Sequence, residues 1–144
     1  MPVVTSRVRV TAMRPLEQAA GVDLEAADVV IGIGRGVGAA GVAPILELAA
    51  RIGAGVAATR EVTDAGWLPR QHQVGLTGRA IAPRLYVAVA IGGAAEHLVG
   101  IRRAGLVVAI NKNAKAPILK AADLGVVADY ATLLPQLASA LRLA

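Results

Sequence analysis

Short runs of aliphatic residues alternate along the chain with glycine-rich turns and with longer segments whose apolar residues recur at helical spacing. Runs rich in Val, Ile and Ala are typical of strands buried on both faces of a parallel sheet. They predict strands at residues 8–10, 28–33, 55–58, 85–91, 106–110 and 126–127. The helical spacing predicts one helix that begins near Pro44 and further helices at residues 94–100, 117–121 and 130–143.

The segment that follows the strand at residues 28–33 has a clear helical pattern. Ile45, Leu48, Ala49 and Ile52 fall on one face of a helix, and the following glycine commonly ends such a helix. Strands that alternate with helices form a parallel sheet with right-handed crossover connections. We therefore expect an α/β fold: a doubly wound parallel sheet with helices on both faces, in three layers.

Residues 59–84 interrupt this alternation with a long segment rich in turn residues. It holds Gly66, Pro69, Gly75, Gly78 and Pro83. A loop of this length in a compact domain is usually functional or disordered. A chain of 144 residues fits one domain. We therefore treat residues 1–144 as a single domain in which residues 1–26 supply an edge strand and a lead-in.

Composition narrows the classes of protein. Apolar residues make up 56% of the chain, which excludes intrinsic disorder, and the net charge of +5 is scattered, which disfavours nucleic-acid binding. The absence of cysteine excludes disulfides and thiolate zinc sites, and two His residues with no carboxylate cluster predict no metal site. The longest charge-free apolar stretch, residues 85–95, is about half of the roughly 20 residues that span a membrane. We expect a soluble, cytoplasmic protein without a secretory signal.

Four segments that leave the predicted strand ends combine small residues with polar ones: residues 32–36, 59–60, 92–97 and 111–113. Ligands of open α/β sheets bind at these ends, and exposed backbone N–H groups there hold phosphate oxygens. A phosphate-bearing nucleotide is the expected ligand. Residues 36–41 match the glycine spacing of a dinucleotide fingerprint, but extra residues separate them from the strand, and the acidic ribose ligand is not evident. An ordinary nicotinamide site is therefore disfavoured.

Several short motifs occur together in a fixed order from residue 34 onward. They are Gly34-Arg35-Gly36, Thr59-Arg60, Asp64-Ala65-Gly66-Trp67, Gln73-Val74-Gly75-Leu76-Thr77-Gly78, Ala82-Pro83 with Leu85-Tyr86, residues 92–97, Ile110-Asn111-Lys112, Ala116-Pro117, and Ala122-Asp123 with Gly125 and Asp129. In this order they resemble the C-terminal FAD-binding domain of the electron transfer flavoprotein α subunit. The resemblance covers about residues 27–143 and implies a three-layer, DHS-like NAD/FAD-binding domain.

The resemblance also implies which residues hold FAD. Arg35 and Thr59 would contact the phosphate and sugar region, and Arg60 would lie over the isoalloxazine ring. The ring would be lined by Gln73, Val74, Gly75, Leu76 and Thr77, with Thr77 near its N5 atom. The pyrophosphate and ribityl chain would be wrapped by Gly92, Gly93, Ala94, Ala95, Glu96 and His97, with His97 reaching the pyrimidine side of the ring. The adenosine end would be held by Asn111, Asp129 and Tyr130.

The chain departs from the family at several of these positions. The family usually has Ser at the positions of Gly32 and Gly92, Gln at those of Leu76 and Glu96, and Asp at that of Asn113. The Glu96 carboxylate matters most, because it repels a pyrophosphate unless it points to solvent or pairs with an Arg. These changes affect the expected FAD affinity more than the fold.

Three functions compete on this reading. The first is an electron carrier, not an enzyme, that takes electrons from flavin dehydrogenases and pairs with a β-like subunit and a separate N-terminal domain. The absence of an evident nucleophile–base pair agrees with a carrier, and no residue is assigned as catalytic. The alternative is an assembly module that binds AMP or ADP and docks a partner without redox activity. A nicotinamide-dependent enzyme ranks third.

Overall fold

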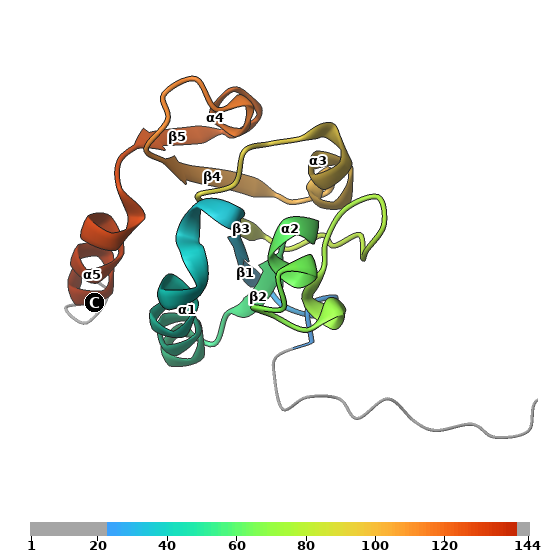
Figure 1. Cartoon of the computed structure of the whole chain (residues 1–144), viewed down its shortest axis with the longest axis horizontal. Helices are drawn as coiled ribbons and strands as arrows, with labels where there is room; N and C mark the ends of the chain where they lie inside the picture. Colours follow the sequence, from blue (N-terminus) through green and yellow to red (C-terminus); the bar gives the residue numbers. More distant parts are fainter. Residues whose placement is uncertain (1–22, 141–144) are drawn as a thin grey trace, which may run out of the picture.

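The computed structural model describes residues 23–140 and places five strands in one parallel sheet (Figure 1). The strands are β1 Val29–Ile33, β2 Gly55–Ala58, β3 Leu85–Val89, β4 Leu106–Asn111 and β5 Leu124–Val127. Their order is β2-β1-β3-β4-β5, and every neighbouring pair is parallel. The strand predicted at residues 8–10 and the last residues of the predicted closing helix, 141–143, lie outside the described residues.

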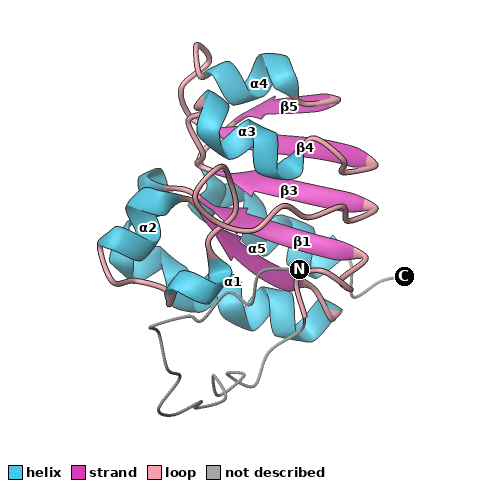
Figure 2. Cartoon of the chain, turned by 90° about the vertical axis from the view of Figure 1, so that its right-hand side faces the viewer, coloured by secondary structure: helices cyan, strands magenta, loops and turns pink. Residues whose placement is uncertain are grey.

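Helices cover both faces of the sheet. They are α1 Gly38–Ile52, α2 Arg60–Asp64, α3 Ala95–Ile101, α4 Pro117–Ala121 and α5 Tyr130–Ala140, with 3-10 turns η1 Arg35–Val37 and η2 Arg70–His72. Residues of α1 and α5 share one core cluster, and residues of α3 and α4 share the other. Figure 2 shows α3 and α4 in front of the sheet and α1 and α5 behind it. The predicted three-layer, doubly wound α/β fold is confirmed.

Each central strand is buried on both faces because successive side chains point in opposite directions. In β1, Ile31 and Ile33 join the core beneath α1, whereas Val30 joins the core beneath α3 and α4. Gly32 allows a close approach on the latter face, because a Cβ added there would overlap the hydroxyl of the fully buried Tyr86. The sheet therefore brings the Tyr86 hydroxyl into the interior, where it needs a polar partner.

Several boundaries differ from the sequence prediction; β5, for example, begins at Leu124 and not at residue 126. Helix α1 begins at Gly38, so Pro44 lies inside the helix rather than in its first turn, and Ile52 is 40% exposed instead of completing the buried stripe. The 3-10 turn η1 leads directly into α1, and Ala39, Ala40 and Ala43 before Pro44 are strong helix formers. Strand β3 ends at Val89 because the next residue, Ala90, has a left-handed φ of 51° that turns the chain.

Residues 59–84 are more ordered than their turn residues suggest. They contain α2 and η2, which the sequence did not predict. Helix α2 has only five residues and, unlike the equally short α4, no proline at its start to mark it. The segment returns to the sheet where Gln73 forms a parallel bridge with Ala58 at the end of β2. Within residues 23–140, none of the helices is long and apolar enough to cross a membrane.

Candidate functional site

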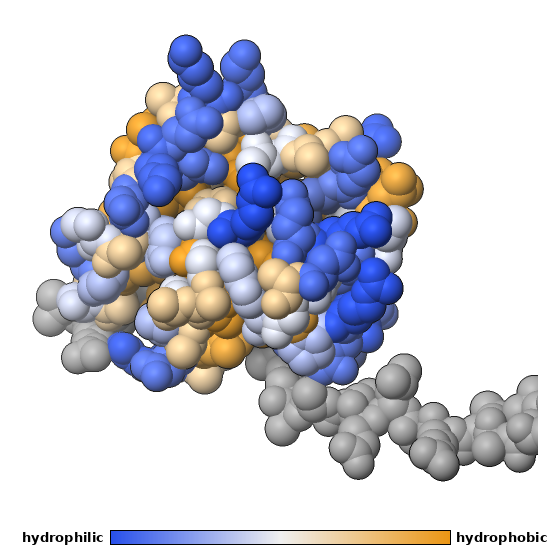
Figure 3. Space-filling model, viewed as in Figure 1, coloured by the Kyte–Doolittle hydropathy of each residue, from blue (hydrophilic) through white to orange (hydrophobic). Residues whose placement is uncertain are grey.

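A hollow of about 370 Å³ lies beside the carboxyl end of β2, between α2, the segment after η2 and the first turn of α3. We call it the polar hollow. Its lining residues are Thr59, Arg60, Glu61, Asp64, Gln73, Val74, Gly75, Leu76, Thr77, Ala94, Glu96 and His97. Figure 3 shows hydrophilic residues gathered over α2 and the segment that follows it. Three carboxylates and one guanidinium thus surround a hollow at the edge of the sheet where α/β proteins bind ligands.

One wall of the polar hollow, residues 73–79, is fixed by backbone hydrogen bonds to neighbouring elements. Val74 N donates to the last carbonyl of β2 at 3.0 Å, and Leu76 N donates to the Glu96 carbonyl of α3 at 2.7 Å. Gly75 has a φ of +135°, and a Cβ added there would lie 2.6 Å from the Glu96 carbonyl oxygen. Only glycine combines this backbone conformation with so close an approach. The wall is therefore held in place by the folded frame.

Thr59 lines the polar hollow, and its hydroxyl is buried. Its side chain follows β2 directly, and its backbone N donates to Ile33 O at 3.0 Å. The residue is only 5% exposed, yet its Oγ1 has no hydrogen-bond partner among the described residues. A buried hydroxyl without a partner costs about 1–3 kcal/mol of stability. A ligand atom that forms a hydrogen bond with this hydroxyl would remove the cost.

Arg60 stands at the outer edge of the same hollow and is held by Asp64. The Arg60 Nε donates to Asp64 Oδ2 at 3.1 Å, and Arg70 Nη2 lies 3.5 Å from the other carboxylate oxygen. The pair follows from the first and last positions of α2, which are four residues apart and share a helix face. The Arg60 side chain is 63% exposed, so the pair adds little stability but limits the directions in which the guanidinium can point.

His97 forms the back of the polar hollow and is already bonded within the protein. Its Nδ1 lies 3.1 Å from Val74 O, so this nitrogen carries the proton, and Nε2 accepts a hydrogen bond from the Tyr86 hydroxyl at 2.9 Å. Burial lowers the pKa of His97 below its usual value, although the Val74 carbonyl and the charge of Glu61 oppose the shift. Burial also raises the pKa of Tyr86. The neutral imidazole therefore joins α3 to the sheet and to the 73–79 wall.

A smaller hollow of about 230 Å³ lies at the carboxyl end of β4, and we call it the Asn111 hollow. Its lining residues are Gly36, Ala90, Ile110, Asn111, Lys112, Ala128, Asp129, Tyr130 and Ala131. Asn111 Nδ2 donates to Ile91 O at 2.8 Å, and the Tyr130 hydroxyl donates to Val37 O at 2.7 Å. Both hollows thus lie at carboxyl ends of strands in the same sheet.

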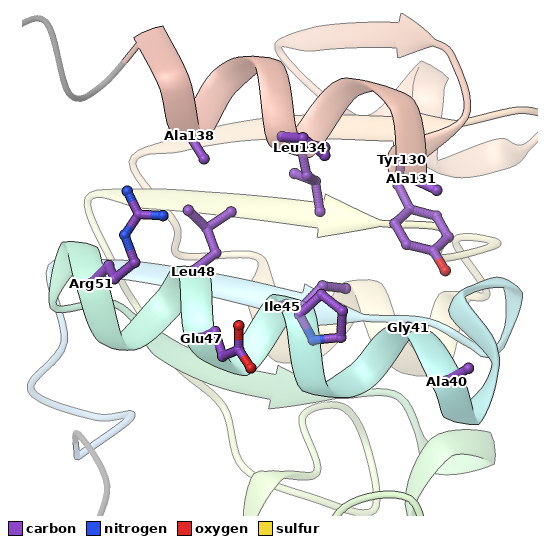
Figure 4. Close-up of a pocket in the computed structure, with 12 residues that line it drawn as sticks. Ala40, Gly41, Ile45, Glu47, Leu48, Arg51, Tyr130, Ala131, Leu134 and Ala138 are labelled. Atoms are coloured by element: carbon purple, nitrogen blue, oxygen red, sulfur yellow. The ribbon is translucent and has the colours of Figure 1, made fainter.

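A third hollow, which we call the α1–α5 groove, encloses about 470 Å³ between these two helices (Figure 4). In Figure 4, Leu48 and Leu134 extend toward each other between the helices, and Arg51 lies at one end. Ile45, Leu48 and Leu134 are buried and belong to the core of the α1 face. The groove is therefore an indentation over the core, with the charged side chains of Glu47 and Arg51 on its α1 side.

Comparison with known proteins identifies the fold family. The family model of the electron transfer flavoprotein FAD-binding domain matches residues 23–102, which is more than half of the chain. The chain belongs to this family. The resemblance inferred from the ordered motifs is thereby confirmed.

Relatives of this flavoprotein domain are considerably longer than the chain. The electron transfer flavoprotein subunit alpha of Thermoanaerobacterium thermosaccharolyticum is 48% identical over 117 residues, which make up 81% of this chain and 36% of that protein. The probable mitochondrial subunit alpha of Caenorhabditis elegans is 45% identical over 120 residues, 83% of this chain and 36% of that protein. The acryloyl-CoA reductase electron transfer subunit beta of Anaerotignum propionicum is 39% identical over 125 residues, 84% of this chain and 34% of that protein. The chain spans about a third of the length of these relatives.

The flavoprotein domain brings most of the predicted site residues into two places. The polar hollow contains Thr59, Arg60, Gln73, Val74, Gly75, Leu76, Thr77, Ala94, Glu96 and His97, and the Asn111 hollow contains Asn111, Asp129 and Tyr130. Arg35, Gly92, Gly93 and Ala95 line neither hollow. Arg35 is exposed on η1, and Gly93 packs its Cα against the backbone of Ile118 at the start of α4.

Glu61, Thr63 and Asp64 were not predicted as site residues. Glu61 and Asp64 line the polar hollow, and Thr63 lies directly behind it. A signal was available for Asp64, because a carboxylate four residues after Arg60 is a common helical ion pair. That spacing has meaning only in a helix, and residues 60–64 were read as part of a loop.

Proposed function

We propose that this flavoprotein domain binds FAD and carries electrons without making bonds on a substrate. The observation that carries the proposal is the unpartnered Thr59 Oγ1, because it is a buried polar atom of a residue that lines the polar hollow. Membership of the FAD-binding domain family supports FAD as the ligand. The two hollows at the carboxyl edge of one sheet suit a ligand with two separate polar ends.

The residues around the two hollows divide the work of holding FAD. Thr59 and Arg35 would bind the phosphate and sugar region, and residues 73–77 would line the isoalloxazine ring. Residues 92–97 would support the pyrophosphate and ribityl chain through their small side chains and backbone. Asn111, Asp129 and Tyr130 would hold the adenosine end. When bound, FAD would supply a ring that takes up and releases electrons.

Arg60 and His97 would act differently on that ring. Arg60 places a permanent positive charge at the outer edge of the polar hollow and would stabilise negative charge there. His97 is neutral and bonded to Val74 and Tyr86, so its main contribution is to hold the back wall. A bond from His97 to the ring would require one of these two hydrogen bonds to be replaced.

The partners proposed for the carrier are a β-like subunit, a separate N-terminal domain and flavin dehydrogenases as electron donors. The names of the longer relatives support an electron-transfer assembly. The outer side of the polar hollow suits such contacts, because Leu76 is 69% exposed and the Arg60 side chain 63% exposed. The domain would share the compartment of its dehydrogenases, which we propose is the cytoplasm.

A second function, an AMP- or ADP-binding assembly module, is favoured by one observation. The polar hollow carries three carboxylates against one guanidinium, which disfavours a pyrophosphate, whereas the Asn111 hollow includes the cation Lys112. Calorimetric titration with AMP, ADP and FAD separates the two functions. A module of this kind would bind AMP at least as tightly as FAD and would show no flavin-dependent redox signal.

Titration of the purified domain with FAD tests the main proposal. We expect a changed flavin absorption spectrum and thermal stabilisation, and the isosteric Thr59→Val variant should bind more weakly by about fivefold, the value of one hydrogen bond. Exposed Thr132 on α5 provides the matched control, Thr132→Val, which should bind as the wild type does. If FAD leaves the spectrum and the melting temperature of the wild-type protein unchanged, the proposal is wrong.

A further inference from the structure

The segment that leaves β1, residues 34–37, lies between the two hollows at the carboxyl edge of the sheet. In the strand order β2-β1-β3-β4-β5, the polar hollow is at the end of β2 and the Asn111 hollow at the end of β4. The connection after β1 leads to β2, and the connection after β3 leads the other way, to β4. Ligands of doubly wound sheets bind where the connections diverge in this way. The 34–37 segment therefore stands where the middle of a ligand with two ends would lie.

Arg35 is the charged residue of this segment, and its backbone decides where its charge lies. The side chain is exposed and makes no ion pair with any other residue in the described range 23–140. Arg60 differs, because Asp64 holds its guanidinium at 3.1 Å. The position of the Arg35 guanidinium thus depends on how firmly residues 34–37 are held.

Residues 34–37 are fastened at both ends. Gly34 N donates to Val89 O at the end of β3 at 2.9 Å, and a Cβ added at Gly34 would overlap the Ala90 carbonyl. At the other end, the Tyr130 hydroxyl lies 2.7 Å from Val37 O. The first attachment belongs to the sheet, whereas the second comes from the first residue of α5. The segment is therefore held on one side only as long as α5 supplies this bond.

The direction of the bond from Tyr130 is fixed by its partner. A carbonyl oxygen can only accept, so the phenol donates its single proton to Val37 O. Gly41 in α1 leaves room for this approach, because a Cβ added there would overlap the Tyr130 hydroxyl. Tyr130 also lines the Asn111 hollow, but its proton is already used within the protein. The hydroxyl therefore serves the 34–37 segment and donates no hydrogen bond to a ligand.

We propose that Tyr130 is a positioning residue whose hydroxyl holds the 34–37 segment in place and thereby directs Arg35 toward the phosphate groups of the bound FAD. This inference rests on the proposed function, because FAD supplies the phosphates. The hydroxyl acts only through Val37, apart from any contact of the Tyr130 ring with the adenosine end. Without the hydroxyl, the segment is released at one end, and the Arg35 guanidinium spends less time near the phosphates.

Titrations with AMP and adenosine separate an effect on the phosphate from an effect on the rest of the adenosine end. Tyr130→Phe keeps the ring and removes the hydroxyl, so it should weaken the binding of AMP and FAD by about three- to tenfold and leave adenosine binding unchanged. Arg35→Gln should show the same pattern. The double variant should bind AMP no more weakly than Arg35→Gln alone, because both changes affect one contact. Thr132→Val removes an exposed hydroxyl from the same turn of α5 and should match the wild type.

Amide hydrogen exchange in the ligand-free protein tests whether Tyr130 holds the segment. Val37 N donates to Gly34 O at 3.1 Å, so its exchange should become faster in Tyr130→Phe and not in Thr132→Val. Unchanged exchange of this amide would overturn the inference, as would unchanged AMP affinity, an equal loss of AMP and adenosine binding, or effects of Tyr130→Phe and Arg35→Gln that add. Failure of the wild-type protein to bind FAD would instead contradict the proposed function, and the exchange of the Val37 amide would still show whether Tyr130 holds the segment.

Discussion

The α1–α5 groove and the polar hollow are similar in size but lined by different chemistry. The groove encloses about 470 Å³ and the hollow about 370 Å³. Ile45 and Leu134 in the groove are core residues, buried by the packing of two helices. The hollow instead combines the unpartnered hydroxyl of Thr59 with exposed charges such as Arg60 and Glu96.

The difference teaches that the volume of a hollow is a poor guide to function in this fold. Tyr130 borders both the groove and the Asn111 hollow, and its hydroxyl already donates to Val37 O. The apolar walls of the groove gain their stability from the core. In the polar hollow, the fold keeps the Thr59 hydroxyl unpaired at a cost of about 1–3 kcal/mol. A buried polar atom without a hydrogen bond marks where a ligand is expected, because a hydrogen bond from the ligand would remove the loss of stability.

The largest change in stability is expected for a substitution in the α1–α5 groove. Leu134→Ala should lower the free energy of unfolding by about 2–4 kcal/mol, since Leu134 is a buried core residue and the smaller side chain leaves a cavity. The FAD dissociation constant, measured at a temperature where both proteins are folded, should not change. Denaturant titration and FAD titration of the same samples check both parts.

Thr59→Val provides the matched opposite case, because it should weaken FAD binding while costing little or no stability. The free energy of unfolding should stay the same or rise, since the variant removes a buried hydroxyl that has no partner. A Leu134→Ala protein that folds but binds FAD several times more weakly would show that the groove belongs to the site, and the contrast between the regions would fail.

The contrast between groove and hollow could be predicted from the sequence only in part. The aliphatic runs predicted the strands, and the left-handed Gly53 with a φ of 67° ends α1 where its position suggested. The ordered motifs predicted ten of the twelve residues that line the polar hollow, but not Glu61 or Asp64. Sequence could not show that Thr59 lacks a partner or that His97 has two, because these facts depend on segments that meet only in the folded sheet.

The short helix α2 shows a different limit of the sequence. Five residues give too few turns for a periodic pattern, and the glycines and prolines after them suggest a loop. The bonds of Thr63 to Gln73 and of Arg60 to Asp64 follow from that helix. Because the sequence did not predict α2, it also did not predict where the charged and hydroxyl groups of that helix lie around the polar hollow.

The pH dependence of stability should report on the wall of the hollow and not on the groove. His97 has a lowered pKa when folded, so below pH about 6.5 the unfolded chain binds a proton that the folded protein does not. The free energy of unfolding should therefore fall as the pH drops below about 6.5. Tyr86 has a raised pKa, so stability should also fall above pH about 10, where only the unfolded chain loses the proton.

Two variants separate the loss of stability at acid pH (the acid limb) from the loss at alkaline pH (the alkaline limb). His97→Gln should flatten the acid limb and Tyr86→Phe the alkaline limb, whereas Leu134→Ala should lower the whole curve and keep its shape. Denaturant titrations from pH 5.5 to 10.5 supply the measurement. If the free energy of unfolding of His97→Gln still falls at acid pH, another group is responsible, and the neutral imidazole of His97 does not cause the loss of stability.

The smallest effect concerns the two opposite charges at the mouth of the polar hollow. Glu96 and Arg60 both line the hollow, and both are exposed, so solvent weakens their influence on a ligand. Glu96→Gln removes a negative charge near the expected pyrophosphate and should tighten FAD binding about two- to threefold at low salt. Arg60→Gln removes the positive charge and should weaken FAD binding by a similar factor.

Salt distinguishes this effect from a change in shape. Both shifts should shrink as ionic strength rises, because the screening length falls from about 30 Å at 0.01 M to about 10 Å at 0.1 M. The same pair should leave the free energy of unfolding nearly unchanged, in contrast to Leu134→Ala. Equal affinities of the wild type and Glu96→Gln at 0.01 M salt would mean that the carboxylate points away from the ligand. The acidic lining would then no longer favour an AMP-binding module over a FAD-binding carrier, and the hydroxyls of Thr59 and Thr77 would remain as the features that set the polar hollow apart from the groove.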